Sequence, residues 1–369
     1  KGPDAMPVFR TSTDKVWEMA LERIADLYTY FPDASLIIYL DDMNQAKEFE
    51  KRLSNILEGR GINKRAGGAV NINIFADEDS RSEVEIVEKA GKTRTITLTD
   101  AKLGRATNVR LAEGLGFNPQ NLIAALTKTL EERGIDPTES VKRLTELLTS
   151  DTGLFYESDY AARARLQNEI EGFLRGIGIG EDSQIWRMLR NKYFNGLYLM
   201  PLTPNRSDQG EVQMFGRAKR QGDFGRVDPF YSLEEGSKFY KMVQQLYDPR
   251  YNPDLTPKEK QDRKKKFEEF LAKITRLGEI EEAIFDTNGR FKSGIDSGIF
   301  NEWCDLQNYF TDLLKTVQFE AQKQRDKSRV DKMERDSKIQ KILEKVRAYP
   351  VQFNARASNP RLACPKKYL

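Results

Sequence analysis

Short strand-like segments, one a continuous apolar run and the others of mixed polarity, follow one another with amphipathic stretches between them through residues 7–118. The strand-like runs fall at residues 35–40, 71–75 and 94–99. Helical periodicity is found up to residue 30 and again at residues 44–57 and 78–90. Strands that alternate with helices in this way predict an α/β fold, in which a parallel sheet carries helices on both faces.

The pattern from Asn118 to about Lys192 is helical throughout. Asn118-Pro119 and Asp136-Pro137 each resemble a helix start, with a capping side chain followed by proline. Periodicity predicts helices over about residues 119–133, 137–149, 158–175 and 182–192. A strand pattern returns at residues 195–200, so we interpret residues 119–194 as a helical insertion.

The chain after Tyr231 returns to a helical and strongly charged pattern. Thr256-Pro257-Lys258-Glu259 is a capping box with proline at the first helical position, and it predicts a long helix to about Phe285. Residues 286–289 break the pattern, and a second helix is predicted over about residues 299–346. Together they predict an antiparallel hairpin. The predicted domains are a RecA-like domain at 7–118 and 195–235, the insertion at 119–194, and a hairpin region with tail at 236–369.

Composition limits the chemistry available to the chain. Its net charge of +3 is too balanced to argue for nucleic acid by itself. The absence of histidine excludes imidazole-dependent serine, cysteine and zinc mechanisms for this chain acting alone. Cys304 and Cys364 lie in unrelated contexts, which favours a reducing compartment over a disulfide framework. With no apolar run of membrane-span length and no signal-peptide pattern, we expect a cytoplasmic protein. Residues 1–6 indicate a start within a longer chain or behind a cloning remnant.

The stretch from Gln213 to Gly225 carries the most functional information. Arg217 and Arg220 are three positions apart on a helix predicted from about Ser207, so their guanidinium groups share one face. Glycines on both sides allow backbone and ligand to approach closely. A guanidinium pair flanked by glycine is what a phosphate-handling site requires.

Residues 96–109 form a second candidate segment, in which a strand runs into a loop with Gly104, Arg105 and Thr107. Ligands of parallel sheets bind at the carboxyl ends of the strands. An ordinary strand-to-helix turn would give the same pattern, and these residues alone leave both interpretations open.

Four other patterns have simple explanations. Residues 91–93 spell Gly-Lys-Thr, but a phosphate loop needs glycine at position 86, where this chain has isoleucine. Asp41-Asp42 after a strand resembles a metal-holding pair, and we favour acidic residues that end a strand at the solvent edge. Residues 264–266 are three lysines on a solvated helix face, and the aromatic residues of 300–320 are interpreted as hairpin packing.

The arginine segment resembles that of a known motor family. Gln213-x-x-Gly216-Arg217-x-x-Arg220 is similar to motif VI of superfamily 2 helicase-type motors. Its continuation through Asp223 to Gly225, with Phe-Tyr-Ser-Leu-Glu at 230–234, resembles the narrower pattern of the SecA preprotein translocase ATPase. Further segments resemble SecA in the same order: residues 83–91, Thr97, the motif V-like Gly104-Arg105-x-Thr107, and Asn195-Gly-Leu197.

The resemblance covers roughly residues 14–118 and 195–235 and implies the second of two RecA-like motor domains. It implies that Arg217 and Arg220 are arginine fingers, which reach the γ-phosphate of ATP across a domain interface. ATP and Mg would be held mainly by an N-terminal RecA-like domain outside this sequence, so ATPase activity would need both domains. The implied nucleotide-side residues are Gln213, Gly216, Gly104, Arg105, Thr107, Asn108 and Asp223.

Four positions within the motif V-like and motif VI-like segments depart from the family pattern, and Asp100-Ala101-Lys102 stands where the family has Thr-Asn-Met. Asn108 stands where the family has aspartate, Ala106 and Lys219 where it has glycine, and Phe224 where it has proline. These changes bear on ATP turnover more than on the fold.

The alternative is therefore a degenerate, non-hydrolysing SecA-like module that serves as a protein-interaction scaffold, for example in a bacterial effector secreted into a host cell cytosol. A nucleic-acid helicase is a third hypothesis, disfavoured by the near-neutral charge. The expected partners are the N-terminal RecA-like domain and a protein substrate bound on the helical regions.

Overall fold

The computed structural model describes residues 6–64, 68–75, 90–100, 119–150, 160–181, 183–188, 197–205, 225–251 and 254–348. The chain divides into two compact units, Lys1–Glu320 and Ala321–Leu369. The first unit contains the sheets. In the second, the described residues form the last part of one helix, α12.

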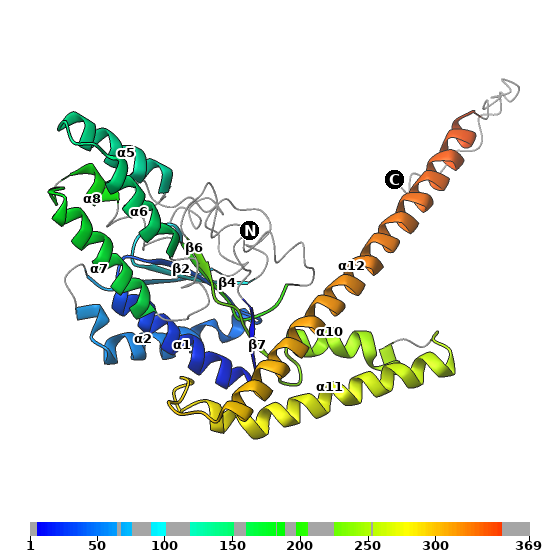
Figure 1. The fold of residues 1–369 in the computed structure, drawn as a ribbon. Coiled ribbons are helices and arrows are strands. Elements are labelled where there is room, and N and C mark those ends of the chain that lie inside the picture. Colours follow the sequence, from blue (N-terminus) through cyan, green and yellow to red (C-terminus); the bar gives the residue numbers. More distant parts are fainter. Residues whose placement is uncertain are drawn as a thin grey trace, which may run out of the picture. The chain divides into compact units, whose positions relative to one another are not determined.

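A parallel sheet forms the centre of the first unit (Figure 1). Among the described residues it has five strands in the order β3-β4-β2-β5-β6, and all of their pairings are parallel. The strands are β2 (Ser35–Tyr39), β3 (Asn71–Ile74), β4 (Thr95–Thr99), β5 (Leu197–Pro201) and β6 (Gly225–Val227). Strands β2, β4 and β5 are buried at every position, which explains the apolar runs of β2 and β5; in β4, isoleucine and leucine alternate with threonine. The predicted α/β fold is confirmed.

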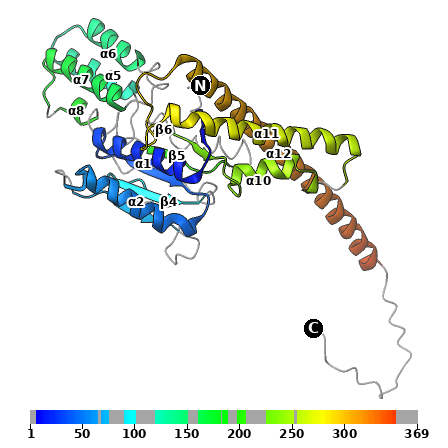
Figure 2. The ribbon, with the colours of Figure 1, turned by 90° about the horizontal axis from the view of Figure 1, so that it is seen from below.

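Side chains of β2 alternate between two hydrophobic clusters, as the two-residue period of a strand requires. Leu36 and Ile38 share a cluster with α1 (Thr13–Tyr30) and α2 (Ala46–Gly59), which lie together along one face of the sheet (Figure 2). Ile37 and Tyr39 belong to the second cluster, with Leu197, Leu199 and Ala90. Ala90 is the one described residue of the helix predicted at 78–90, and the others lie outside the described residues.

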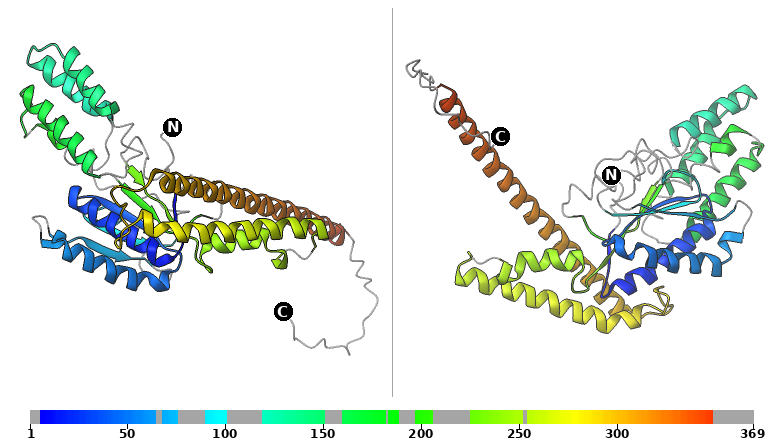
Figure 3. Two further views of the ribbon diagram at one scale, coloured as in Figure 1. Left: turned by 60° about the horizontal axis from the view of Figure 1, so that its bottom comes forward. Right: turned by 180° about the vertical axis from the view of Figure 1, so that it is seen from behind.

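The secondary-structure elements described within residues 119–194 are helices. They are α5 (Pro119–Glu132), α6 (Thr138–Ser150), α7 (Tyr160–Gly176) and α8 (Gln184–Met188), grouped together in Figure 3. Trp186 of α8 is fully buried, and its indole Nε1 donates a hydrogen bond to the Ile179 carbonyl at 2.8 Å. Leucines and isoleucines of α5, α6 and α7 are buried in the same cluster as α1.

A second, two-stranded sheet was not predicted in full. Strand β1 (Val8–Arg10) pairs in parallel with β7 (Phe230–Ser232), 222 residues apart at Val8 and Phe230 (230 − 8). The sequence interpretation took residues 7–30 only as the approach to a helix, because three residues are too short to reveal a two-residue period. Helix α10 (Lys238–Tyr247) follows β7 and packs beside it.

The hairpin prediction is confirmed. Helix α11 (Pro257–Ile284) begins at the predicted capping box, and α12 (Ser297–Ala348) follows it. Arg276 of α11 donates to both carboxylate oxygens of Glu302 in α12, at 2.6 and 2.8 Å, and the rings of Phe270 and Phe310 meet edge to face. The aromatic residues after position 300 therefore include hairpin packing contacts, as predicted, and residues 264–266 are exposed. No helix among the described residues has the length and apolarity needed to cross a bilayer.

The turn between α11 and α12 lies against α1. Gly289 in this turn has a φ of +74°, and a Cβ at this position would stand 2.9 Å from the backbone nitrogen of Met19. Only glycine satisfies both the left-handed backbone and the close approach. Next to it, Arg290 bridges Glu22 and Asp26 of α1.

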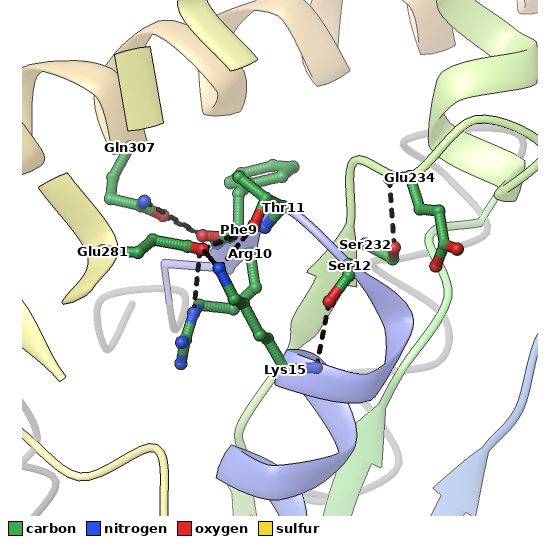
Figure 4. Close-up of polar contacts among 9 residues, drawn as sticks. All are labelled: Phe9, Arg10, Thr11, Ser12, Lys15, Ser232, Glu234, Glu281 and Gln307. Atoms are coloured by element: carbon green, nitrogen blue, oxygen red, sulfur yellow. Dashed lines mark hydrogen bonds and ion pairs between the residues drawn. The ribbon is translucent and has the colours of Figure 1, made fainter. Parts of the chain in front are cut away.

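A buried carboxylate fastens the hairpin to the turn between β1 and α1 (Figure 4). Glu281 of α11 is 1% exposed and accepts from Arg10 Nε at 2.9 Å, Thr11 N at 3.0 Å and Lys15 Nζ at 2.7 Å. The Thr11 hydroxyl donates to the same carboxylate at 2.5 Å. Beside it, the carboxamide of Gln307 in α12 accepts from Phe9 N at 2.7 Å and donates to Phe9 O at 3.2 Å. Both hairpin helices thus bind the same strand, β1.

We expect Glu281→Gln to lower the free energy of unfolding by about 3 kcal/mol, because it leaves the buried Arg10 guanidinium without its counter-charge. Glu282→Gln is the matched control, since Glu282 is exposed, and it should change stability by less than about 0.5 kcal/mol. Urea unfolding followed by circular dichroism measures both. Equal stability of the two variants would contradict the assigned role of Glu281.

The same carboxylate predicts a defined pH dependence. Burial opposes ionisation of Glu281, but hydrogen bonds from Lys15 and Thr11 and the charge of Arg10 outweigh burial and lower its pKa. The stability that Glu281 contributes is therefore present above its ordinary pKa of 4.5 and is lost as pH falls through the lowered value. The difference in unfolding free energy between wild type and Glu281→Gln should shrink as pH falls below 4.5. A difference that stays constant down to pH 3 would contradict this.

Candidate functional site

Strands β4 and β5 end at the same edge of the sheet, and each is followed in the chain by one of the two predicted phosphate-side segments. In the register of the sheet, Tyr39 of β2 pairs with Thr99 of β4 on one side and with Pro201 of β5 on the other. Neighbouring strands are about 4.8 Å apart, so Thr99 and Pro201 are roughly 10 Å apart. The chain enters residues 101–118 just after Thr99 and residues 206–224 just after Asn205. Both segments therefore start from the edge at which parallel sheets bind ligands.

The predicted site residues themselves lie outside the described residues. Arg217, Arg220, Gln213, Gly216 and Asp223 belong to residues 206–224. The others, Gly104, Arg105, Thr107 and Asn108, belong to residues 101–118. The structure thus brings together the strand ends from which these residues follow, and the roles of the side chains stay predictions.

The exit segment, Leu202–Asn205, leads from β5 toward the arginine segment and is buried at all four positions. Leu202 N donates to Tyr39 O at 2.8 Å, and the Thr203 hydroxyl donates to Asp41 at 3.0 Å. Asn205 O accepts from Nε2 of Gln318 in α12 at 3.0 Å. The exit segment is therefore held by the neighbouring strand, the loop after that strand, and the hairpin.

Sequence reasoning missed the two buried glutamines of α12, of which Gln318 holds the exit segment and Gln307 holds β1. Gln307 and Gln318 are 5% and 1% exposed, and they lie among the buried apolar residues of α12, which include Phe310, Leu314 and Val317. A polar side chain on an otherwise apolar helical stripe is the signal that could have singled them out.

The two aspartates after β2 have structural partners. Asp41 binds the Thr203 hydroxyl with one oxygen, and with the other it accepts from the backbone N of Lys238 at 3.0 Å, at the start of α10. Asp42 accepts from Asn44 N at 2.9 Å and caps a short 3-10 helix. Both are exposed, as the solvent-edge interpretation predicts. Within the described ranges, no group of three or more metal-binding side chains gathers.

The Gly-Lys-Thr sequence at 91–93 forms a turn that precedes β4. A phosphate loop follows a strand and opens a helix, which is the opposite order. The Lys92 carbonyl accepts from the Ser35 hydroxyl at 2.5 Å, so the turn is tied to the start of β2 at the amino edge of the sheet. The chance-match interpretation of this tripeptide is confirmed.

We expect Asp41→Ala to lower the unfolding free energy by about 2 kcal/mol, because it removes acceptors that join β5 and α10 to the loop after β2. Asp42→Ala removes one local capping bond and should lower it by about 1 kcal/mol or less. Millimolar Mg²⁺ should shift the thermal midpoint of wild type and both variants equally. A magnesium-dependent stabilisation that only wild type shows would instead support a metal-holding pair.

Comparisons with known proteins show a consistent partial similarity. No family model matches the chain. "Protein translocase subunit SecA" of Thermus thermophilus is 31% identical over 158 residues, which are 43% of this chain and 14% of that protein. "Protein translocase subunit SecA 1" of Corynebacterium jeikeium is 26% identical over 51% of this chain and 17% of its own length. The protein of the same name from Streptomyces avermitilis is 26% identical over 57% of this chain and 18% of its own length. The matched region is thus less than a fifth of each relative.

Proposed function

Since the chain is a divergent SecA-like protein, we propose that it is one part of an ATP-driven motor for protein translocation. In this proposal residues 7–118 and 195–235 form the second RecA-like domain of the motor. ATP and Mg would be held mainly by a phosphate-loop domain outside this sequence, and this chain would contribute Arg217 and Arg220 from the facing side. A cytoplasmic location follows from the same proposal.

The observation that carries the proposal is the strand order β4-β2-β5. Residues 94–109 contain β4, and residues 213–225 follow β5 in the chain; these two strands flank β2 and end at one edge. A nucleotide site needs contributions from both segments, since motif V-like and motif VI-like residues act on one phosphate chain. The similarity to SecA and the sheet topology therefore support the same assignment.

The proposed chemistry follows from the residue types. The two guanidinium groups would bind the oxygens of the transferring γ-phosphoryl group and stabilise the charge that spreads over them in the transition state. Bound Mg would neutralise charge on the β- and γ-oxygens. Gln213 and Arg105 would support the nucleotide from this side, and Thr107 would steady the loop after β4. Arginine is suited to this task because its guanidinium group stays charged at any physiological pH and presents paired donors to phosphate oxygens.

A second candidate function is favoured by Asn108 and Lys219, which replace the aspartate and the glycine of the SecA pattern. In this alternative the RecA-like domain keeps its fold without hydrolysing ATP. The insertion and the hairpin then bind another protein, as in a bacterial effector that acts in a host cytosol.

We expect Arg217→Ala and Arg220→Ala, each made in the full-length parent protein, to lower kcat for ATP hydrolysis by about 10³-fold or more. Lys265→Ala is the control, because it removes a positive charge from an exposed position of α11 outside the proposed site; its kcat should stay within about twofold of wild type. Steady-state ATPase kinetics measures all three. Wild-type turnover that neither arginine variant changes would contradict the finger assignment. Absence of wild-type turnover would favour the scaffold.

A further inference from the structure

We propose that Gln318 of α12 is a positioning residue for the arginine segment, an inference that rests on the proposed ATP site. Gln318 holds Asn205, the last described residue before the segment that carries Arg217 and Arg220. Through this hydrogen bond, a hairpin helix holds the residue from which the chain enters the arginine segment. Gln318 would touch neither nucleotide nor Mg.

Within the exit segment, the last residue, Asn205, is the one whose position depends on Gln318. Leu202 and Thr203 are fixed by Tyr39 and Asp41, as described above. Pro204 has a restricted φ and restricts the residue before it, so the backbone direction after Thr203 is stiff. The Asn205 carbonyl is then held from the other side by Gln318, with a donor–acceptor distance of 3.0 Å. Loss of this bond would therefore shift the point from which the chain enters the arginine segment.

The Gln318 side chain is itself buried in the core and bonded to Asn205. It is 1% exposed, and its neighbours on α12, Leu314 and Val317, are 3% and 2% exposed in the core. Its Oε1 is buried and has no hydrogen-bond partner among the described residues, so the Nε2 bond to Asn205 is what orients the carboxamide there. When a buried hydrogen bond is lost, water does not replace it. The bond from the Gln318 amide to the Asn205 carbonyl is therefore stronger evidence for positioning than a solvent-exposed contact would be.

The same helix supplies a matched control. Gln307 is also buried, also bonds a backbone carbonyl through Nε2, and lies about three turns before Gln318, on the same helical face. Its partner is Phe9 of β1, not the exit segment. Loss of either amide should weaken hairpin docking, but only loss of the Gln318 amide should disturb the start of the arginine segment.

The test uses Gln318→Glu and Gln307→Glu, which replace the amide donor by an acceptor of the same shape. In the full-length parent protein, Gln318→Glu should lower kcat for ATP hydrolysis by about tenfold or more while KM for ATP stays within about twofold. Gln307→Glu should leave kcat within about twofold. In the 369-residue chain, hydrogen exchange of peptides that cover the exit segment should speed up in Gln318→Glu and not in Gln307→Glu. Should Gln318→Glu fail to fold, Gln318→Met removes the donor without adding a charge.

The outcomes are distinguishable. Unchanged exchange of the exit segment in the Gln318 variant would overturn the proposal, whatever the ATPase result. Equal losses of kcat in the two glutamine variants would also overturn it, because a purely structural role in the hairpin would then explain both. A wild-type parent protein that hydrolyses no ATP would overturn the proposed function and, with it, the catalytic meaning of Gln318; the exchange comparison would still decide whether Gln318 holds the exit segment.

Discussion

The buried ion pair between Glu281 and Arg10 is the contact on which the described position of the hairpin depends. The two residues are 271 positions apart in the chain and are almost fully shielded from water. An unpaired charge at such a place would be strongly unfavourable, so the carboxylate is tolerated only with the cations, hydroxyl and amide that surround it. Glu281 in α11 is bound to β1 and its turn, and α12, the other helix of the hairpin, lies where Gln318 reaches the Asn205 carbonyl. The contact between Glu281 and Arg10 thereby helps to set the position of the contact between Gln318 and Asn205, which precedes the proposed site.

Much of the fold could be predicted because its signals are local. The fully buried strands β2 and β5 have short apolar runs, and β4 alternates threonine with isoleucine and leucine. Helix α11 begins at a capping box whose residues are four consecutive positions. Strands β1 and β6 have three residues each and carry no measurable period, so the sequence pattern does not reveal them. Glu281 was missed for another reason. It lies in a run with Glu279 and Glu282, which is typical of a solvated helix face, although it falls on the stripe of Leu277, Ile280 and Ile284.

The site residues were predicted from residue types and a family resemblance. That the strands preceding them end at one edge of the sheet could be learned only from the structure. Nothing local in the sequence indicates that β4 and β5 flank β2 while β3 lies at the far edge, since strand order depends on how the crossovers pack. The partners of the exit segment are similarly non-local: Asp41 and Gln318 come from 162 and 113 positions away. The arginines, by contrast, could be singled out from their spacing and flanking glycines alone.

The central claim is that this chain supplies one side of a shared ATP site. A structure of the full-length parent protein with Mg and a non-hydrolysable ATP analogue tests it most directly. The account predicts the γ-phosphate beyond the carboxyl ends of β4 and β5, with guanidinium nitrogens of Arg217 and Arg220 within about 3 Å of its oxygens. A nucleotide bound elsewhere, or bound with both arginines directed away from it, would contradict the account.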